Sequence, residues 1–485
     1  MVGQSIFIAT ILVACVLFSV DGSHFRGGVI TWTPSSPLPP PPGTFPTVLF
    51  TYRVAFRRSF SSDHFCDIST ITARIPNPGE GFLECDNGCT TLNDDLDYIC
   101  TDFSVAADWT TGEGSSTFNP QTNIFEVFYE GGNWITLANG GNGNWIIRSR
   151  VDLTPRMDNG RINSSPTTSN MPINRIQINC PVSYRIPVTD PDRDTVRCRF
   201  ASAIGDECGS ICGQSPGNLI EEDCIIEWMP TTVGLFGVAV QIEDFLTPAS
   251  TTPLSSIPLQ FLFEVIEGDG TCVDAPVYGP TVLPVESCIG VSPGSTFTTR
   301  ITAIVSTPTR SIVSINTVSP IGLSTTPVQQ VPGSADAYFV DVTFTSANLA
   351  QLQEIFCFVA EDSGGLTSNQ RCIFLVTATS PPLATSATID SNNLLTIIFD
   401  QPITIPTSPA GLVIITSLQT GLQLLSFNTS VDATLARGNT ALLFQLPFSL
   451  GETVLVNVQR HVVETNTFCG VENDPTTIPV GRGPK

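Results

Sequence analysis

Residues 355–377 read IFCFVAEDSGGLTSNQRCIFLVT, and this stretch decides the fold class. Two apolar runs rich in β-branched and aromatic residues flank the turn sequence SGG, a pattern typical of two antiparallel strands joined in a hairpin. Cys357 and Cys372 lie symmetrically about Gly364 and Gly365, each seven residues from the nearer glycine. Residues placed in this way face each other across an antiparallel pair, so the spacing predicts a cross-strand disulfide.

The same arrangement occurs a second time, 118 residues earlier in the chain. Residues 236–244 form an apolar run that ends in Glu-Asp at 243–244, as the run in the hairpin ends in Glu-Asp at 361–362, and a further apolar run follows at 258–266. An interval of 118 residues is the size of one β-sandwich domain. We therefore interpret the two stretches as equivalent parts of tandem modules of the Ig-like or cadherin-like type.

The rest of the chain continues this pattern. Short runs rich in Val, Ile, Thr and Phe alternate with Gly, Pro, Asn and Ser, and 38 Gly and 38 Pro exclude long helices. We predict an all-β chain of tandem β-sandwiches with disulfides. The expected order is a signal peptide (1–22), a Trp-rich disulfide-bonded β domain (23–168), two Ig-like or cadherin-like sandwiches (169–270 and 271–380) and an Ig-like sandwich (381–485).

The first residues predict export. An apolar run at 6–20 has the length of a secretory signal and ends in Val20-Asp21-Gly22, so we expect cleavage after Gly22 and a secreted, extracellular protein. An uncleaved N-terminal anchor is the alternative. The mature chain has no apolar run of about 20 residues, so no transmembrane segment is expected in it. The net charge of −23 excludes the basic surface of a nucleic-acid binder.

Cysteine usage agrees with an oxidising compartment. Of 15 cysteines, 14 remain once Cys15 leaves with the signal peptide, and an even number permits complete pairing. The spacing of three residues between Cys85 and Cys89, and between Cys208 and Cys212, also suits zinc ligands, but disulfides are favoured in an exported chain. The disulfide candidates form four groups: Cys66, Cys85, Cys89 and Cys100; Cys180, Cys198, Cys208, Cys212 and Cys224; Cys272, Cys288, Cys357 and Cys372; and Cys469. The first group is expected to pair within itself in one of three connectivities, whereas the second requires a pair across a domain boundary or two free thiols.

The sequence Asp190-Pro-Asp192-Arg-Asp194 is the sharpest polar cluster. Three carboxylates alternate over five residues, and calcium takes six to eight oxygen ligands, mainly carboxylate and carbonyl. With residues 186–196 around it, the turn resembles the Asp-Pro-Asp-Gly-Asp turn of cadherin-like repeats, except that Arg193 stands where Gly is usual. The resemblance implies a calcium site formed by Asp190, Asp192 and Asp194. The alternative is a solvated β-turn, in which Asp is favoured for its bonds to the backbone.

Other polar residues are weaker candidates. The acidic pairs at 243–244 and 361–362, and Asp158, could add ligands to a calcium site, although acidic pairs at strand ends are usually solvated. Asn163-Ser-Ser and Asn428-Thr-Ser are N-glycosylation acceptors, which we expect at the surface of an exported chain.

Nothing in the sequence points to a catalytic site. Only three histidines occur; His64 and His461 fall in different modules, and His24 lies at the expected mature terminus. Nucleophile-elbow, zinc-protease and phosphate-loop motifs are absent from the sequence. The Trp-rich stretch at 129–145 would suit a carbohydrate platform or the core of a β-sandwich, and we favour the core. We therefore do not expect an enzyme.

Several motifs resemble one family of exported proteins. They are SHFRGGVITW at 23–32, CTDFS at 100–104 with DW at 108–109, NSSP at 163–166, PINR at 172–175, VRCRF at 196–200, QIEDF at 241–245 and PLSSIPLQF at 253–261. Over roughly residues 23–378, the chain resembles secreted invertebrate multidomain proteins, some of them similar to organic-matrix proteins of coral skeletons and mollusc shells. The last module, through LLTIIFD at 394–400 and GETVLVNV at 451–458, resembles Ig-like modules of bacterial surface-layer proteins.

We therefore expect a secreted structural protein of the extracellular matrix, and the resemblance implies a role in the organic matrix of a calcified skeleton. The expected partners are other matrix components or a mineral surface, because a diffuse charge of −23 favours calcium-rich surroundings. The first alternative is a cell-surface or shed adhesion protein that binds calcium or carbohydrate. The second is a secreted hydrolase.

Overall fold

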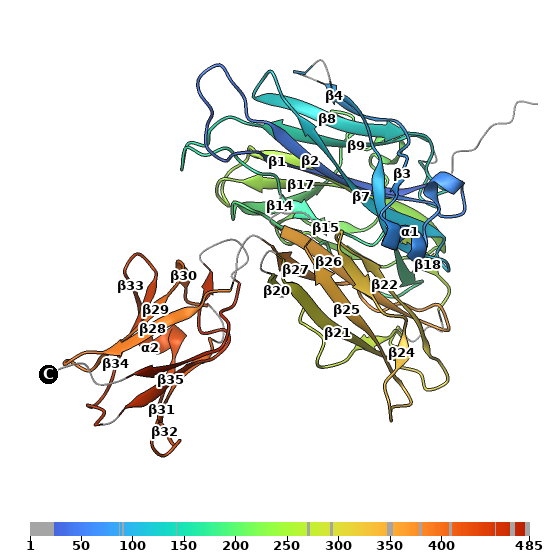
Figure 1. The fold of residues 1–485 in the computed structure, drawn as a ribbon. Coiled ribbons are helices and arrows are strands. Elements are labelled where there is room, and N and C mark those ends of the chain that lie inside the picture. The colour runs from blue at the N-terminus through green and yellow to red at the C-terminus, as the bar shows by residue number, and fades with distance from the viewer. Residues whose placement is uncertain are drawn as a thin grey trace, which may run out of the picture.

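The computed structural model describes residues 24–86, 88–89, 92–141, 143–268, 272–291, 294–346, 353–377, 381–406, 410–451, 453–465 and 471–480. The expected signal peptide, including Cys15, lies outside the described residues, and so does Cys469. The described chain is nearly all β, which confirms the predicted fold class. We divide it into an N-terminal block (24–266), a middle sandwich (277–376) and a C-terminal sandwich (384–480), which Figure 1 shows in blue to green, yellow to light orange, and orange to red.

The N-terminal block is built on one 13-stranded sheet. Its strands are β3 (Pro76–Asn77), β6 (Tyr98–Ser104), β7 (Trp109–Phe118), β2 (Val48–Phe56), β1 (Phe25–Pro34), β18 (Ser255–Ile266), β9 (Trp145–Asp152), β8 (Ile124–Gly131), β4 (Phe82–Asp86) and β5 (Asn93–Asp95), in sheet order, with β11 (Ile173–Gln177), β14 (Thr195–Phe200) and β17 (Gly234–Phe245) off this path. Strand β18 connects the two halves of the block. One edge of β18 pairs with β17, and its other edge is shared by β9 at Ser256, β1 at Leu259 and Gln260, and β11 from Leu262 onward.

The domain boundary expected at residue 168 does not separate two cores. A single hydrophobic cluster extends from Phe25 in β1 to Val265 in β18. The polar stretch that has the composition of a linker, 158–172, is mostly buried. The backbone N–H and carbonyl of Trp32 bond the hydroxyl and the N–H of Ser165, at 2.9 and 3.0 Å. Composition misleads here because these small polar residues satisfy backbone groups inside the block.

Short elements complete the N-terminal block. They are η1 (Ser62–His64), α1 (Ile68–Ala73), the pair β10 (Thr167–Thr168) and β13 (Val188–Thr189), the sheet of β12 (Val182–Arg185), β16 (Ile225–Trp228) and β15 (Asn218–Ile220), and the 3-10 turns η2 (Gly209–Ile211) and η3 (Glu221–Asp223). Among the described residues, no helix combines the length and the apolar character that a membrane crossing requires.

The middle sandwich packs two sheets around a core of its own. One sheet contains β19 (Val277–Tyr278), β21 (Thr296–Ile304), β25 (Ala337–Thr345) and β23 (Leu323–Thr325), with β24 (Gln329–Gln330) on β25, and the other contains β20 (Cys288–Gly290), β27 (Arg371–Val376), β26 (Gln353–Asp362) and β22 (Ile312–Val318). Strand β26 is apolar on both faces. Phe356 and Phe358 enter the core of the sandwich, whereas Cys357 and Val359 pack beside Trp109 of the N-terminal block. The continuous apolar run thus reflects burial on two sides.

The C-terminal sandwich has a separate core. Its sheets are β28 (Ala384–Ile389), β29 (Leu394–Phe399), β34 (Ala441–Gln445) and β33 (Ala433–Ala436); β32 (Gln423–Asn428), β31 (Leu412–Ser417), β35 (Val454–Val458) and β37 (Thr476–Val480); and the pair β30 (Ile403–Thr404) and β36 (Glu464–Thr465), with the short helix α2 (Thr429–Asp432). Burial alternates along β31 and β35, as expected for strands with one face in the core.

The disulfides follow the predicted grouping and resolve its alternatives. The pairs are Cys66–Cys100, Cys85–Cys89, Cys180–Cys272, Cys198–Cys224, Cys208–Cys212 and Cys357–Cys372, and Cys288 is also disulfide-bonded. Cys357 and Cys372 are direct partners in the β26–β27 register, which confirms the cross-strand bond. The bond from Cys180 to Cys272 crosses the boundary expected at residue 270 and anchors the connection to the middle sandwich.

Candidate functional site

The acidic turn lies between β13 and β14 of the N-terminal block, and Asp190 fixes its backbone. Oδ1 of Asp190 accepts hydrogen bonds from the backbone N–H groups of Asp192 and Asp194, at 2.8 and 2.9 Å. Arg193 has a φ of 66°, the left-handed conformation that glycine adopts most readily, and glycine is the usual residue of the similar cadherin-like turns. The turn predicted from the sequence is therefore present, with Asp190 as its anchor.

Asp190 and Asp194 meet a third carboxylate, that of Asp244 at the end of β17. Oxygen atoms of the three side chains lie within 4.8 Å of one another. Asp190 is 2% and Asp244 0% exposed, and Oδ2 of Asp190 has no hydrogen-bond partner among the described residues. Asp192 points away, because its carboxylate accepts the N–H of Ser164 at 2.7 Å. The structure thus joins two of the three predicted ligands to Asp244, which the sequence offered only as an additional ligand.

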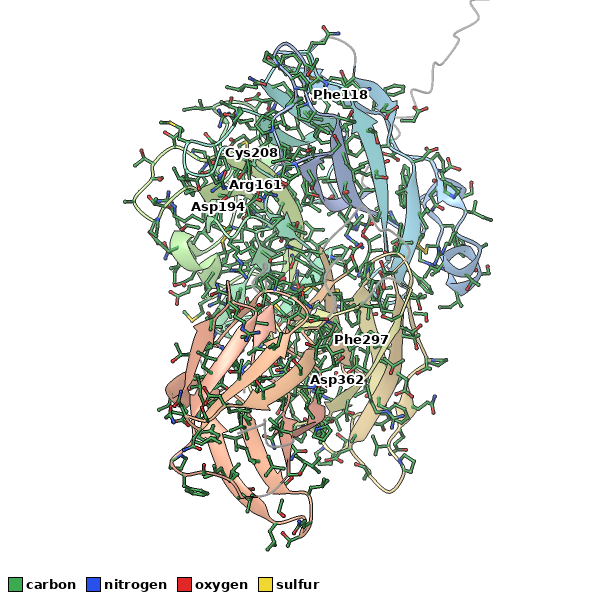
Figure 2. The ribbon with its side chains drawn as sticks, turned by 60° about the vertical axis from the view of Figure 1, so that its left-hand side comes forward. Phe118, Arg161, Asp194, Cys208, Phe297 and Asp362 are labelled. Atoms are coloured by element: carbon green, nitrogen blue, oxygen red, sulfur yellow. A yellow bond between two sulfur atoms is a disulfide. The ribbon has the colours of Figure 1, made fainter. Side chains whose placement is uncertain are left out.

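One guanidinium group partly neutralises this acidic cluster. Arg156 binds both carboxylate oxygens of Asp194 and also pairs with Asp158. Figure 2 labels Asp194, whose side chain is 6% exposed. Two other acidic candidates are engaged elsewhere: Glu243 pairs with Arg199 at 3.0 Å, and Asp362 holds its own turn by accepting two backbone N–H groups. These acidic side chains therefore do not add to the cluster.

The cluster favours a bound positive charge. Burial, and then the neighbouring charge of Asp244, raise the pKa of Asp190 well above its ordinary value. Burial raises the pKa of Asp244 to about 7, although Ser255 and Asn163 donate hydrogen bonds to it. Carboxylates this close cannot all be ionised unless a cation lies between them. Without a cation, at least one of them retains its proton. The all-oxygen donor set is of the kind that calcium prefers.

Asn163 is part of this site and not a surface acceptor. Its side chain is buried, at 2% exposed, and Nδ2 donates to Asp244 at 2.5 Å. The expectation that Asn163 lies at the surface is therefore wrong, because the folded chain uses the nitrogen to which a glycan would be attached. Asn428 lies at a more open position, where its Oδ1 caps α2 by accepting the N–H of Ser430 at 3.1 Å. Its glycosylation stays a prediction.

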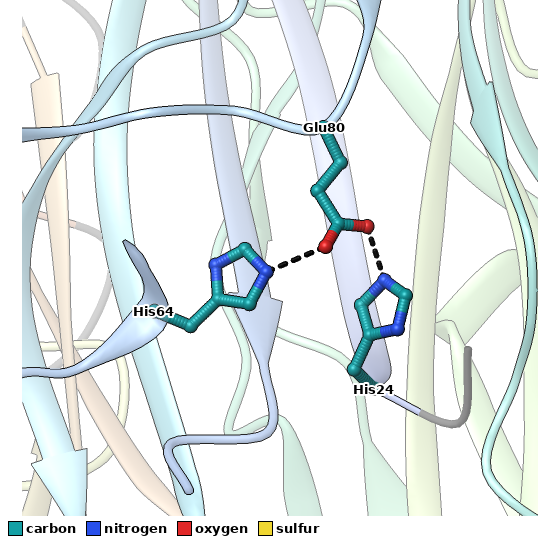
Figure 3. Close-up of side chains that lie close together, drawn as sticks. All are labelled: His24, His64 and Glu80. Carbon is teal, nitrogen blue, oxygen red and sulfur yellow. Dashed lines mark hydrogen bonds and ion pairs between the residues drawn. The ribbon is translucent and has the colours of Figure 1, made fainter. Parts of the chain in front are cut away.

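A second cluster joins the two histidines that the sequence left apart. His24, just before β1, and His64, in η1, both direct Nε2 at the carboxylate of Glu80, which lies between β3 and β4 (Figure 3). The His64 contact measures 2.6 Å, and the His24 contact is to the other carboxylate oxygen. Phe56 stacks on His64, and Phe60 stacks on His24, with ring centres 4.4 and 4.3 Å apart.

The contacts with His24 and His64 favour the ionised form of Glu80. Burial would raise the pKa of Glu80, but the hydrogen bonds from His24 and His64 outweigh it and lower the pKa to about 2. Sequence reasoning missed the cluster because His24 and His64 lie 56 and 16 residues from Glu80. In addition, none of the three residues belongs to a strand, so strand alternation does not place them. No motif spacing would have joined them.

The Trp-rich stretch forms core and not a carbohydrate platform. Trp134 and Trp145 are 1% and 0% exposed. The ring of Trp145 stacks on Phe25 with centres 3.9 Å apart, and Tyr129 contacts it edge-on. Phe25 belongs to the SHFRGG motif, so that motif contributes to packing at the start of β1.

A cavity of about 450 Å³ lies between the N-terminal block and the middle sandwich. It is lined by Trp109, Arg175 and Tyr184 from the block, and by Tyr278, Glu361 and Gln370 from the sandwich. Arg175 donates to Glu264 at 2.7 Å and to Glu361 at 2.5 Å, so its charge is neutralised inside the cavity. The cavity has aromatic residues in its lining and lies at a junction between domains, where ligand sites are often found.

Fold and sites together define a multidomain, disulfide-bonded β-sandwich protein with a buried acidic cluster in its largest block. Residues 26–154 match the family described as "Integrin beta-like protein A-E, N-terminal". Integrin beta-like proteins C and A of Dictyostelium discoideum are each 24% identical to this chain, over 282 and 276 residues. The matches cover 56% and 54% of this chain but 13% of each relative, so the chain spans about an eighth of the length of the curated relatives it matches.

Solved structures with β-sandwich domains are also similar. The sialic acid binding region of a Streptococcus sanguinis adhesin is 10% identical and has a TM-score of 0.17, with 48% of this chain and 92% of that chain covered. The eight N-terminal Ig domains of Down Syndrome Cell Adhesion Molecule are 9% identical with a TM-score of 0.19, over 84% of this chain and 50% of that chain. At these TM-scores, neither similarity adds to what the all-β architecture itself shows.

Proposed function

We propose that this chain is part of an extracellular or cell-surface adhesion protein, which binds a partner and does not turn over a substrate. The observation that carries the proposal is the similarity to the integrin beta-like proteins, which covers more than half of this chain. The family match at 26–154 falls inside the N-terminal block. That block is tied internally by disulfides and packs on the middle sandwich, which suits a rigid module that presents a binding surface.

We further propose that calcium binds among Asp190, Asp194 and Asp244 of this module. Three carboxylates face one guanidinium, that of Arg156, so the cluster has an excess of negative charge. The buried Oδ2 of Asp190 lacks a hydrogen-bond donor among the described residues, which supports a ligand at this point. Calcium would satisfy that oxygen and displace the proton that the raised pKa of Asp244 implies.

The relatives favour adhesion over the structural role in a mineral matrix that the sequence suggested. A chain that works in a matrix should associate with washed, demineralised matrix. A chain that works in adhesion should instead bind a cell-surface component saturably. We also propose that the apolar segment at 6–20 directs export, as an adhesion role requires.

Binding of the purified chain, labelled with a fluorophore, to cells of its own species tests the adhesion proposal. We expect saturable binding that the unlabelled chain displaces and that a reduced, alkylated sample does not show. The same labelled chain is offered to demineralised matrix in parallel. Saturable binding to matrix, with none to cells, would replace the adhesion proposal by the matrix role.

A further inference from the structure

The strongest feature outside the acidic cluster is the convergence of His24, His64 and Glu80. One ligand atom from each side chain lies within 4.8 Å of the other two. The histidine side chains are 4% and 2% exposed, whereas Glu80 is 27% exposed. The two imidazoles are therefore buried, and Glu80 is the most exposed of the three side chains.

From this geometry we propose that His24, His64 and Glu80 form a zinc site. Two imidazole nitrogens and one carboxylate are a donor set that zinc binds with a fourth position left open. Imidazole excludes calcium and magnesium as the preferred ions, because these take oxygen ligands. The site is separate from the acidic cluster and does not depend on the adhesion proposal.

The surroundings hold the ligands in place for such a role. The rings of His24 and His64 are near-parallel, with centres 5.7 Å apart, and both directed nitrogens are Nε2. His64 Nδ1 lies 3.4 Å from the hydroxyl of Tyr98. The backbone N–H of Glu80 donates to the hydroxyl of Tyr129 at 3.1 Å. Such contacts behind the ligands orient them, as in known zinc sites.

Hydrogen bonding alone leaves one imidazole of this cluster incompletely satisfied. Buried polar atoms in folded proteins usually have a hydrogen-bond partner. His24 Nδ1 is buried and has no hydrogen-bond partner among the described residues, so the polar anchor of this ring is on the side that faces Glu80. Zinc would join three segments, namely the start of β1, η1 and the approach to β4, at one end of the block.

Zinc titration of the purified full chain tests the proposal by calorimetry and by metal analysis after dialysis. We expect the wild type to retain a zinc ion that Glu80→Gln does not retain, with an affinity loss of more than ~100-fold. The loss of a residue that only supports a zinc ligand already lowers affinity ~10–100-fold. Glu80→Gln preserves shape at a partly exposed position, so it should fold, and circular dichroism checks this.

His461→Ala is the matched control, because His461 lies beside Glu464 and Glu472 in the C-terminal sandwich. It should leave zinc binding unchanged. Cobalt in place of zinc should give intense visible absorption, typical of four-coordinate geometry, in the wild type and in His461→Ala but not in Glu80→Gln. Equal zinc uptake by the wild type and Glu80→Gln, or no uptake by the wild type, would overturn the proposal and leave a hydrogen-bonded bridge.

Discussion

Asp102 in β6 accepts two hydrogen bonds from Ser319, one from its backbone N–H at 2.7 Å and one from its hydroxyl at 2.8 Å. The two residues are 217 positions apart and belong to the N-terminal block and the middle sandwich. The Thr317 hydroxyl donates to the same carboxylate, and Arg53 donates to the carbonyl of Ser319 at 2.8 Å. Asp102 lies in the CTDFS motif, so part of that motif serves the junction between domains.

Asp102→Ala should therefore weaken this junction. The change leaves buried donors of Ser319 and Thr317 without an acceptor, which should lower the free energy of unfolding by about 2–3 kcal/mol. Differential scanning calorimetry should show the block and the middle sandwich unfolding at more widely separated temperatures. Asp341→Ala, at an exposed ion pair with Arg300, should leave the transitions unchanged. An Asp102→Ala thermogram identical to that of the wild type would refute the role of this contact.

Stability should depend on pH through a second pair of buried acids at the same junction. Burial raises the pKa of Glu113, which Arg53 contacts at 2.7 Å, and burial together with the charge of Glu113 raises the pKa of Glu354. The unfolded chain loses these protons near pH 4.3, roughly the ordinary value, whereas the folded chain retains them to higher pH. Stability should therefore fall as the pH rises above that value.

Glu354→Gln measures this effect, because it removes one of the two carboxylates that share Arg53. The melting temperature of the variant should rise relative to that of the wild type as the pH goes from 4.5 to 8. Parallel curves of melting temperature against pH for the two proteins would contradict the assignment.

Millimolar calcium should raise the melting temperature if the acidic cluster binds it. A concentration of 100 times Kd corresponds to about 2.7 kcal/mol of stabilisation. Asp244→Asn should abolish this rise. Asp192→Ala should retain it, because Asp192 bonds the backbone of Ser164 and does not face the cluster. A rise that survives Asp244→Asn but disappears in Asp192→Ala would favour the trio predicted from the sequence alone.

Removal of the bond between Cys180 and Cys272 should destabilise the connection to the middle sandwich. The two cysteines are 92 residues apart, and disulfides that close loops of this order contribute about 2–5 kcal/mol. The double variant Cys180→Ser/Cys272→Ser should unfold at lower denaturant concentration. Peptide mapping without reduction should recover the two cysteines in one linked fragment. A fragment that links Cys180 to another cysteine would show the pairing to be wrong.

Local pattern was enough to predict the strands, the β26–β27 hairpin and its disulfide, because these depend on alternation and on symmetry about one turn. The boundary at 168 failed because β18 pairs with strands from both halves of the block, and such pairing leaves no local signal. The turn at Asp190 was predictable from its motif. The convergence of Asp244 with Asp190 was not, because the register of β17 against β14 determines it.

The same limit applies to the histidine cluster and to Asn163. His24 directly precedes β1, whereas His64 and Glu80 lie between strands, and the sheet that brings the three together is formed by long-range pairing. Asn163 fits a glycosylation motif, but only the fold shows that its amide is buried against Asp244. The sequence therefore showed which residues could bind a metal or carry a glycan. It did not show which residues they contact in the folded chain.

Retention of cells on the immobilised chain, counted under flow with calcium and with a chelator, tests the adhesion account most directly. The account predicts retention well above that on an albumin-coated surface, lost in chelator and strongly reduced on Asp244→Asn but kept on Asp192→Ala. Retention equal to that on albumin, for a chain whose folding is verified by circular dichroism, would contradict it.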